Sequence, residues 1–157
     1  MGKPVTLIFD IGKTNKKLFL FDEDLSEISH EYIRFDEIPD EDGFLSEDLT
    51  SLVKWVKESA NKVLQDPTYD VKAINFSTYG ASMVHLDEQG ELVTPFINYL
   101  KPFPEELSKD FFSKYGPEEK FSVSTASPSM GMLNSGLQLY YLKYAQPEAF
   151  KRLHKSL

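Results

Sequence analysis

Hydrophobic and polar positions in the first part of the chain follow strand-like patterns. Positions 5–9 form an almost unbroken apolar and β-branched run, which predicts a strand buried on both faces. Residues 17–22 form a second apolar run, and the short interval between the two runs predicts a hairpin. Residues 27–35 alternate more openly, which predicts a third strand nearer an edge.

An acidic segment and a helical pattern come next. Residues 36–48 hold seven acids, and this composition favours a solvated loop over a metal site, since no fixed ligand spacing is visible. Ser46 is expected to cap the helix that follows. Apolar residues recur at helical spacing over 49–64, so this helix should bury one stripe against the sheet, with Trp55 packed beside it.

The second half of the chain predicts short strands and then helices. The expected strands cover residues 71–76, 83–86 and 92–99. The expected helices cover residues 102–116, 134–144 and 147–157. No stop signal ends the last helix, so we expect the natural chain to continue. Hairpin-linked strands followed by a helix, a strand and more helices predict an α/β fold with a mixed sheet.

Composition narrows the function classes. The 157 residues and 18.0 kDa correspond to one domain. The net charge of −8 opposes a general role on nucleic acid or anionic membranes. The absence of cysteine excludes disulfides and thiolate metal sites. No signal peptide or membrane span is visible, so we expect a cytoplasmic protein.

The strongest candidate for chemistry is the stretch 10–16, Asp-Ile-Gly-Lys-Thr-Asn-Lys, which follows the first predicted strand. A tight turn exposes backbone N–H groups that bind anions, and hydroxyl, amide and lysine side chains add donors. The carboxylate would repel phosphate unless it holds Mg²⁺, which bridges carboxylate and phosphate oxygens. Asp10 is therefore the expected metal ligand. The expected residues of the polyphosphate site are Asp10, Gly12, Lys13, Thr14, Asn15 and Lys16.

Two other interpretations of this stretch deserve comparison. A Walker A loop requires a glycine at position 7, where the chain has Leu7, and a helix after Thr14, where the pattern predicts a strand. That interpretation therefore fails. A plain polar hairpin turn, with Asp10 accepting backbone hydrogen bonds, remains an alternative.

The histidine and tyrosine side chains outside this turn are expected to have packing roles and not to form a metal or catalytic site. His30, His85 and His154 have no Glu or Cys at ligand spacing, which argues against zinc. Tyr140, Tyr141 and Tyr144 are expected to form an exposed helix face, through which a homodimer could form.

Three collinear stretches give the chain a resemblance to the FGGY carbohydrate kinases. Residues 9–15, Phe-Asp-Ile-Gly-Lys-Thr-Asn, with the strand that follows, resemble the first phosphate motif of the family, usually D-x-G-T-T or D-x-G-T-S. Residues 73–87 resemble its strand, sugar-contacting turn and strand. Residues 121–157, with Leu-Tyr-Tyr-Leu-Lys-Tyr-Ala-Gln-Pro-Glu, resemble the segment that carries its K-L-x-W-L-x-x-x-x-P-E helix.

This resemblance implies a ribonuclease-H-like fold, shared with actin and hexokinase, and ATP-dependent phosphorylation of a sugar, a ketose or deoxyketose, with Mg²⁺. It implies a sugar site at Thr78, Tyr79, Gly80 and Ser82. The chain corresponds to the N-terminal part of a family member. The second domain and the catalytic base are then expected downstream, so that this chain alone should not be a competent kinase.

Several positions depart from the family pattern. Lys13 stands where the family usually has Thr. The turn 77–82 is most similar to the D-T-W-G-V-D turn of the rhamnulokinase-like branch, with Ser77 and Ser82 in place of both acids. Residues 98–102 occupy the place of an aromatic-x-Asp-x-Arg segment and keep only the aromatic residue. A non-catalytic binding or assembly module is the alternative function, and another phosphotransferase on the same fold is a third.

Overall fold

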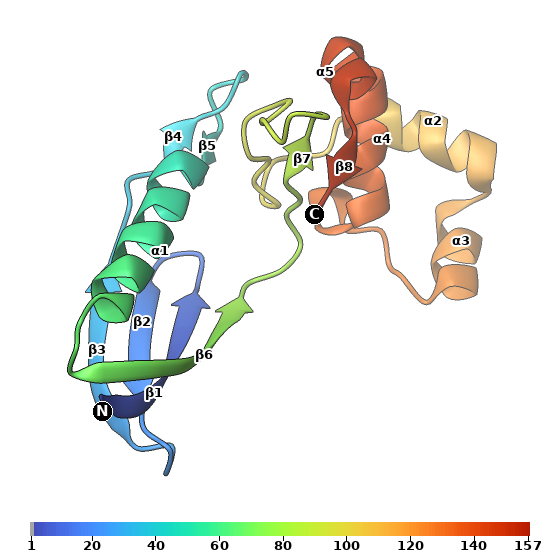
Figure 1. The fold of residues 1–157 in the computed structure, drawn as a ribbon. Helices are drawn as coiled ribbons and strands as arrows, with labels where there is room; N and C mark the ends of the chain where they lie inside the picture. The colour runs from blue at the N-terminus through green and yellow to red at the C-terminus, as the bar shows by residue number, and fades with distance from the viewer. Residues whose placement is uncertain (1) are drawn as a thin grey trace. The chain divides into compact units, whose positions relative to one another are not determined.

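The computed structural model describes residues 2–157, which form two compact units (Figure 1). The first unit contains residues 2–36 and 48–80, and the second contains residues 37–47 and 81–157. The chain therefore passes from one unit to the other after Asp36, after Glu47 and after Gly80. Each unit has its own cluster of buried apolar side chains.

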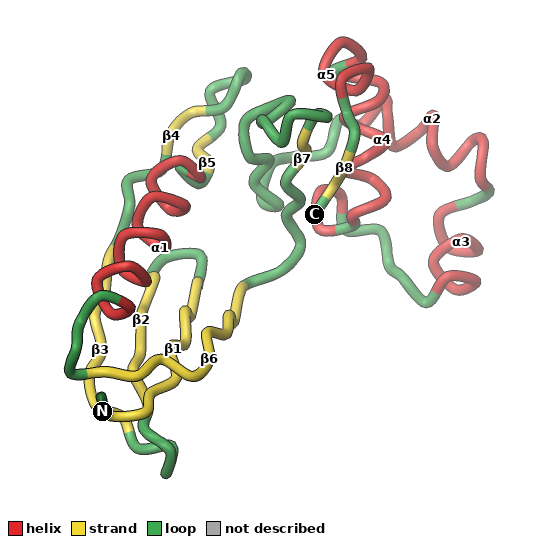
Figure 2. Tube along the Cα trace, viewed as in Figure 1, coloured by secondary structure: helices red, strands yellow, loops and turns green. Residues whose placement is uncertain are grey.

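A four-stranded mixed sheet forms the body of the first unit, with the strand order β3-β2-β1-β6. Its strands are β1 (Lys3–Ile11), β2 (Lys16–Phe21), β3 (Glu27–Ile33) and β6 (Tyr69–Thr78). Strands β1, β2 and β3 pair antiparallel in sequence order, whereas β6 lies parallel to β1. The predicted hairpin, third strand and mixed α/β sheet are confirmed, and Figure 2 shows the four strands in yellow.

Helix α1 (Leu49–Leu64) lies along the sheet of this unit (Figure 1). The ring of Trp55 meets that of Phe9 edge to face, with 5.5 Å between centroids. Such a contact contributes about 1 kcal/mol beyond the burial of the rings. The predicted helix and its packing role for Trp55 are confirmed, but Val53 and Leu64 stay about half exposed, since the buried stripe runs through Leu52, Trp55, Ser59 and Val63.

The start of α1 differs from the prediction. Asp48 is the N-cap residue, and its Oδ1 accepts a hydrogen bond from the backbone N–H of Ser51 at 3.0 Å. Ser46 was expected to be the cap, which is wrong, because its hydroxyl donates to the carbonyl of Phe96 and its backbone belongs to a short strand. The carboxylate at position 48 therefore compensates the free N–H groups of the helix start.

Alternation along β1 decides which side chains meet α1. Val5, Leu7, Phe9 and Ile11 are buried and belong to the core cluster that includes Trp55. Because successive side chains of a strand point to opposite faces, Asp10 lies on the other face of the sheet. Its side chain is 39% exposed, so the carboxylate is not part of the apolar packing.

Helices dominate the second unit. They are α2 (Glu105–Tyr115), α3 (Glu118–Thr125), the 3₁₀ helix η1 (Gly131–Leu133), α4 (Ser135–Ala145) and α5 (Pro147–Arg152). Two small antiparallel pairs accompany them, β4 (Ile38–Pro39) with β5 (Leu45–Ser46) and β7 (His85–Leu86) with β8 (Lys155–Ser156). The core of this unit contains Ile97, Met132 and Tyr141.

Three predictions for this unit need correction. Residues 92–99 do not form a strand beyond a single bridge of Leu92 to Leu86, since Pro95 interrupts the run and the Asn98 side chain accepts the N–H of Leu100 in a turn. The last helix ends at Arg152, because the segment after it pairs with β7. Helix α3 was not predicted.

The expected exposed tyrosine face is also wrong. Tyr140 and Tyr141 are buried at 7% and 5% exposure, and only Tyr144 is substantially exposed. The ring of Phe111 packs edge to face on Tyr140 with 5.1 Å between centroids, so α2 covers much of this face. Among residues 2–157, the structure contains no helix with both the length and the apolar character that a membrane crossing requires.

Candidate functional site

The turn that joins β1 to β2 is tight and closed by its own backbone. The N–H of Gly12 donates to the carbonyl of Asn15 at 3.0 Å. A Cβ atom at position 12 would lie 3.0 Å from that carbonyl oxygen, so a side chain there would force the turn to shift. Glycine therefore stands where the backbone of residue 12 comes close to the backbone of Asn15. The turn leads into strand β2, as predicted.

Asp10 precedes this turn and has a basic neighbour. Its register partner on β2 is Lys17, and the Lys17 Nζ lies 3.4 Å from Asp10 Oδ2. Both side chains are about one-third exposed, so the pair is a weak surface contact that a ligand can replace. A partly exposed carboxylate beside a lysine suits a hard cation and the anionic group that the cation brings.

The buried side chain of Lys16 contacts the backbone of the turn. The residue is only 2% exposed, and its Nζ donates to the carbonyl of Lys13 at 2.9 Å. The ammonium group therefore interacts with the backbone of the turn, while Thr14 is exposed. Of the residues that the sequence assigned to the phosphate site, Lys16 is the one whose side chain is most enclosed.

Arg34 is a neighbour of the turn that the sequence did not indicate. Its Nε donates to Asn15 Oδ1 at 2.6 Å. Strand pairing explains this contact. Lys16 lies opposite Ile33 in the antiparallel pair β2–β3, and Asn15 and Arg34 are the next residues beyond this pair. The turn thus gains a further cation from a distant part of the sequence.

The predicted sugar turn begins at the same edge of the sheet. Thr78 lies opposite Ile11 in the parallel pair β1–β6, and the N–H of Tyr79 donates to the Ile11 carbonyl at 3.1 Å. Carboxyl ends of parallel strands lie at one edge, so Thr78 and Tyr79 come close to the end of β1. Tyr79 also packs against the core of the first unit, and Gly80 is exposed.

Ser82 belongs to the second unit. Its Oγ is buried, and among residues 2–157 it has no hydrogen-bond partner. The preceding residue, Ala81, has a φ of 66°, which is the left-handed region that residues with a side chain rarely adopt. Its carbonyl accepts a hydrogen bond from Gln138 Nε2. The predicted residues Thr78, Tyr79 and Gly80 therefore lie in one unit and Ser82 in the other.

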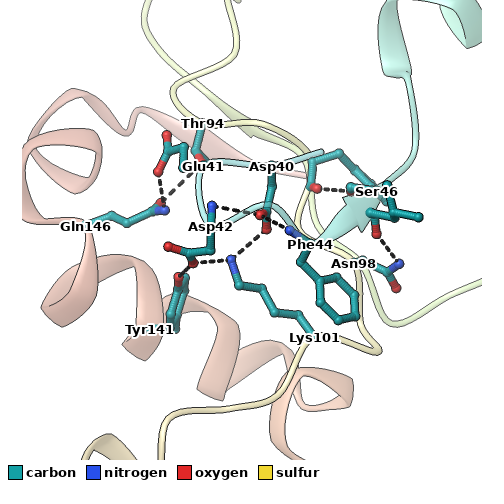
Figure 3. A network of polar contacts seen from close by, with 12 residues as sticks. Asp40, Glu41, Asp42, Phe44, Ser46, Thr94, Asn98, Lys101, Tyr141 and Gln146 are labelled. Atoms are coloured by element: carbon teal, nitrogen blue, oxygen red, sulfur yellow. Dashed lines mark hydrogen bonds and ion pairs between the residues drawn. The ribbon is translucent and has the colours of Figure 1, made fainter. Parts of the chain in front are cut away.

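Most of the acidic segment is exposed, as its composition predicted, but Ser46 and Glu47 and the side chain of Asp40 are buried. Figure 3 shows the segment fixed by polar contacts within the second unit. Lys101 Nζ donates to Asp40 Oδ2 at 2.6 Å and to Asp42 Oδ2 at 2.5 Å, and the side chains of Lys101 and Asp40 are 9% and 6% exposed. Tyr141 adds a bond from its hydroxyl to Asp42 at 3.2 Å. A distant lysine thus holds the segment.

The protonation states of this cluster follow from its contacts. Burial alone would lower the pKa of Lys101, but its hydrogen bonds to Asp40 and Asp42 outweigh burial and raise that pKa. Burial alone would raise the pKa of Asp40, but Lys101 and the backbone N–H groups of Phe44 and Asp42 lower it overall. The cluster therefore stays charged at neutral pH.

More contacts tie the acidic segment to its surroundings (Figure 3). Gln146 Nε2 donates to Glu41 Oε2 at 2.6 Å, and Asn98 Nδ2 donates to the carbonyl of Leu45 at 2.8 Å. Both Asn98 and Lys101 belong to the segment 98–102 that departs from the family pattern. Within residues 2–157, no cluster of three His, Asp or Glu side chains has the arrangement of a metal site.

His85 is a packed histidine. It is 1% exposed, and its Nδ1 lies 2.9 Å from the Ser156 Oγ of the paired strand β8. Burial lowers its pKa, so the ring is neutral at physiological pH.

The sequence of the chain was compared with models of known protein families and with curated proteins. Residues 5–157 match the profile of the N-terminal domain of the FGGY family of carbohydrate kinases. A search among curated protein sequences finds no significant match.

Solved structures of sugar kinases share the fold. A carbohydrate kinase from Novosphingobium aromaticivorans is 26% identical with a TM-score of 0.79, over 100% of this chain and 32% of that one. A gluconate kinase from Lactobacillus acidophilus is 20% identical with a TM-score of 0.78, over 99% and 31%. The glycerol kinase of Plasmodium falciparum with ADP is 20% identical with a TM-score of 0.75, over 96% and 30%.

The chain thus spans about a third of the length of the kinases that it matches. The mixed α/β sheet, with its hairpin and parallel fourth strand, is the ribonuclease-H-like arrangement of that group, as the sequence predicted. The match over residues 5–157 and the fold agree, and this chain belongs to the FGGY family of carbohydrate kinases, to whose N-terminal domain it corresponds.

Proposed function

We propose that this chain forms the N-terminal part of an ATP-dependent sugar kinase and binds a magnesium-bound polyphosphate at the β1–β2 turn. Asp10 would hold the cation, and residues 12–16 would bind phosphate oxygens through backbone and side-chain donors. The observation that carries the proposal is the exposed Asp10 carboxylate beside a glycine turn, in a chain of this family. A hard oxygen ligand next to N–H and lysine donors fits such a group.

The proposed sugar contacts are Thr78, Tyr79, Gly80 and Ser82. Two features support them. Thr78 and Tyr79 lie at the same sheet edge as Asp10, and the buried Ser82 Oγ has no partner among the described residues. Hydroxyl groups of a polyhydroxylated substrate could both donate to and accept from a serine. Solved structures of a gluconate kinase, a glycerol kinase and a xylulose kinase, all similar to this chain, suggest gluconate, glycerol and xylulose as first candidate substrates, with rhamnulose as the test of the rhamnulokinase-like branch.

Transfer itself would need more than these residues. The phosphoryl group must be aligned with a sugar hydroxyl and shielded from water, which in such enzymes follows domain closure. The catalytic base is proposed to lie in a second domain outside the 157 residues, so the chain alone would bind ligands without turnover. We also propose a cytoplasmic location, where ATP is available.

Calorimetric titration tests the proposal with Mg-ATP and, separately, with each of these four candidate substrates. Binding of Mg-ATP and of at least one candidate substrate supports the kinase assignment. Absence of both kinds of binding supports the alternative of a non-catalytic module, which the replacement of acids by Ser77 and Ser82 favours.

A further inference from the structure

Gln138 connects two separate segments inside the second unit. It lies on α4 and is 0% exposed. Its Nε2 donates to the carbonyl of Ala81 and to the carbonyl of Met132, so both side-chain N–H groups are used. The residue thus fastens the end of the proposed sugar turn to the 3₁₀ helix η1.

The turn at Ala81 needs such support. With a φ of 66°, Ala81 adopts a left-handed conformation that costs a residue with a side chain about 1 kcal/mol or more. Gly80, which precedes it, is exposed, and no atom would lie within 4 Å of a Cβ placed there. Packing around Gly80 therefore does not hold the turn, whereas the bond from Gln138 acts directly on the strained residue.

Two buried atoms near this bond lack partners. Within residues 2–157, neither the Oγ of Ser82 nor the Oε1 of Gln138 has a hydrogen-bond partner. An unpaired buried polar group costs about 1–3 kcal/mol, so a hydroxyl group that reached Ser82 would recover part of that energy. The placement of Ser82 depends on Ala81, to which it is directly linked.

We infer that Gln138 is a positioning residue for sugar recognition, which holds the Ala81 carbonyl and thereby presents Ser82 to a hydroxyl group of a polyhydroxylated ligand. The inference rests on the proposed function, because it assumes that Ser82 contacts the sugar. Gln138 itself does not touch the ligand and acts through the turn.

Gln138→Met tests this role, because methionine keeps the length and apolar volume of the side chain and removes both donors. We expect the affinity for the best-bound of the four candidate substrates to fall about tenfold, while Mg-ATP affinity is unchanged. In the double variant with Ala81→Gly, part of the sugar affinity should return, because glycine adopts a positive φ without strain. Carbon chemical shifts of Ala81 should lose their left-handed signature in the single variant.

Gln146→Met is the matched control. Gln146 follows the same helix and also makes two side-chain hydrogen bonds, to Glu41 and Thr94, but none to Ala81. We expect it to leave sugar affinity unchanged. Equal losses of sugar and Mg-ATP affinity in the two variants would mean general destabilisation and would overturn the positioning role.

Different results would contradict the role of Gln138 and the proposed sugar site. Wild-type chain that binds a sugar, together with folded Gln138→Met chain that binds it equally well, overturns the role of Gln138 and leaves the kinase assignment in place. Wild-type chain that binds none of the four candidate substrates overturns the proposed sugar site, and the role of Gln138 falls with it.

Discussion

The side chains of Arg34 and Asn15 meet beside the β1–β2 turn, where Arg34 Nε donates to Asn15 Oδ1 at 2.6 Å. This bond fixes which end of the Asn15 amide faces the guanidinium. The carboxamide oxygen is occupied, so the amide N–H₂ group is the end left to act as a donor at the turn. Arg34 thus contributes a cation and orients a donor.

Replacement of Arg34 by glutamine should weaken Mg-ATP binding. We expect a loss of about threefold, since an exposed charge contributes only about 0.6 kcal/mol. Lys54→Gln, which removes one charge from an exposed position of α1, should leave binding unchanged. Calorimetric titration at one ionic strength measures both, and equal affinities of the two variants would contradict a specific role for Arg34.

Lys101→Met should destabilise the protein strongly. It leaves the buried Asp40 carboxylate without its cation, and the removal of one partner of such a pair costs about 3 kcal/mol. Lys109→Met is the control, because the Lys109 side chain is 61% exposed and its ion pairs with Glu105 and Glu106 contribute little. Urea denaturation followed by circular dichroism measures both. A loss no larger than that of the control would mean that the cluster is not stabilising.

Stability should fall on acidification, partly because of Asp40. The pKa of Asp40 in the folded protein lies below its ordinary value of 3.8. The contribution of the Asp40 carboxylate to the free energy of unfolding is therefore fully present above pH 3.8 and is lost as the pH falls through the pKa of the folded state. We therefore expect the urea midpoint of Asp40→Asn, already reduced at pH 7, to decline less than that of the wild type below about pH 4. Parallel declines would contradict this assignment.

The start of α1 can be tested at Asp48. Asp48→Ala should reduce the free energy of unfolding by about 1 kcal/mol, whereas Asp48→Ser should retain most of it, because serine is also a good N-cap. Fluorescence of Trp55, the only tryptophan of the chain, follows the unfolding of the first unit in urea. Equal losses in the two variants would show that the carboxylate acts otherwise than as a cap.

Local features of the fold could be predicted from the sequence. The hairpin of β1 and β2, the helix over Leu49–Leu64 and the tight turn after Asp10 depend on periodicity and on glycine within a few residues, and the structure has all three. The candidate metal and phosphate residues were likewise contiguous, so strand pairing alone brings Asp10 next to Lys17 and the turn.

Features that depend on distant partners could not be predicted. Acidic composition suggested solvent around Asp40, but Lys101 buries it from 61 positions away. Arg34 reaches Asn15 only through the register of β2 and β3, and Gln138 reaches Ala81 only through the packing of α4. Tyr140 was expected on the surface because the sequence does not show that Phe111 of α2 packs against it.

The most direct test of the polyphosphate site compares ATP affinity with and without Mg²⁺ for the wild type and Asp10→Asn. The amide keeps the size of the side chain and removes the charge that holds the cation and repels bare phosphate. We predict that Mg²⁺ strengthens ATP binding by the wild type about tenfold or more, and that this ratio falls to near one in Asp10→Asn, with metal-free ATP bound no more weakly than by the wild type. An unchanged ratio in the variant would contradict the role of Asp10 and with it the proposed site.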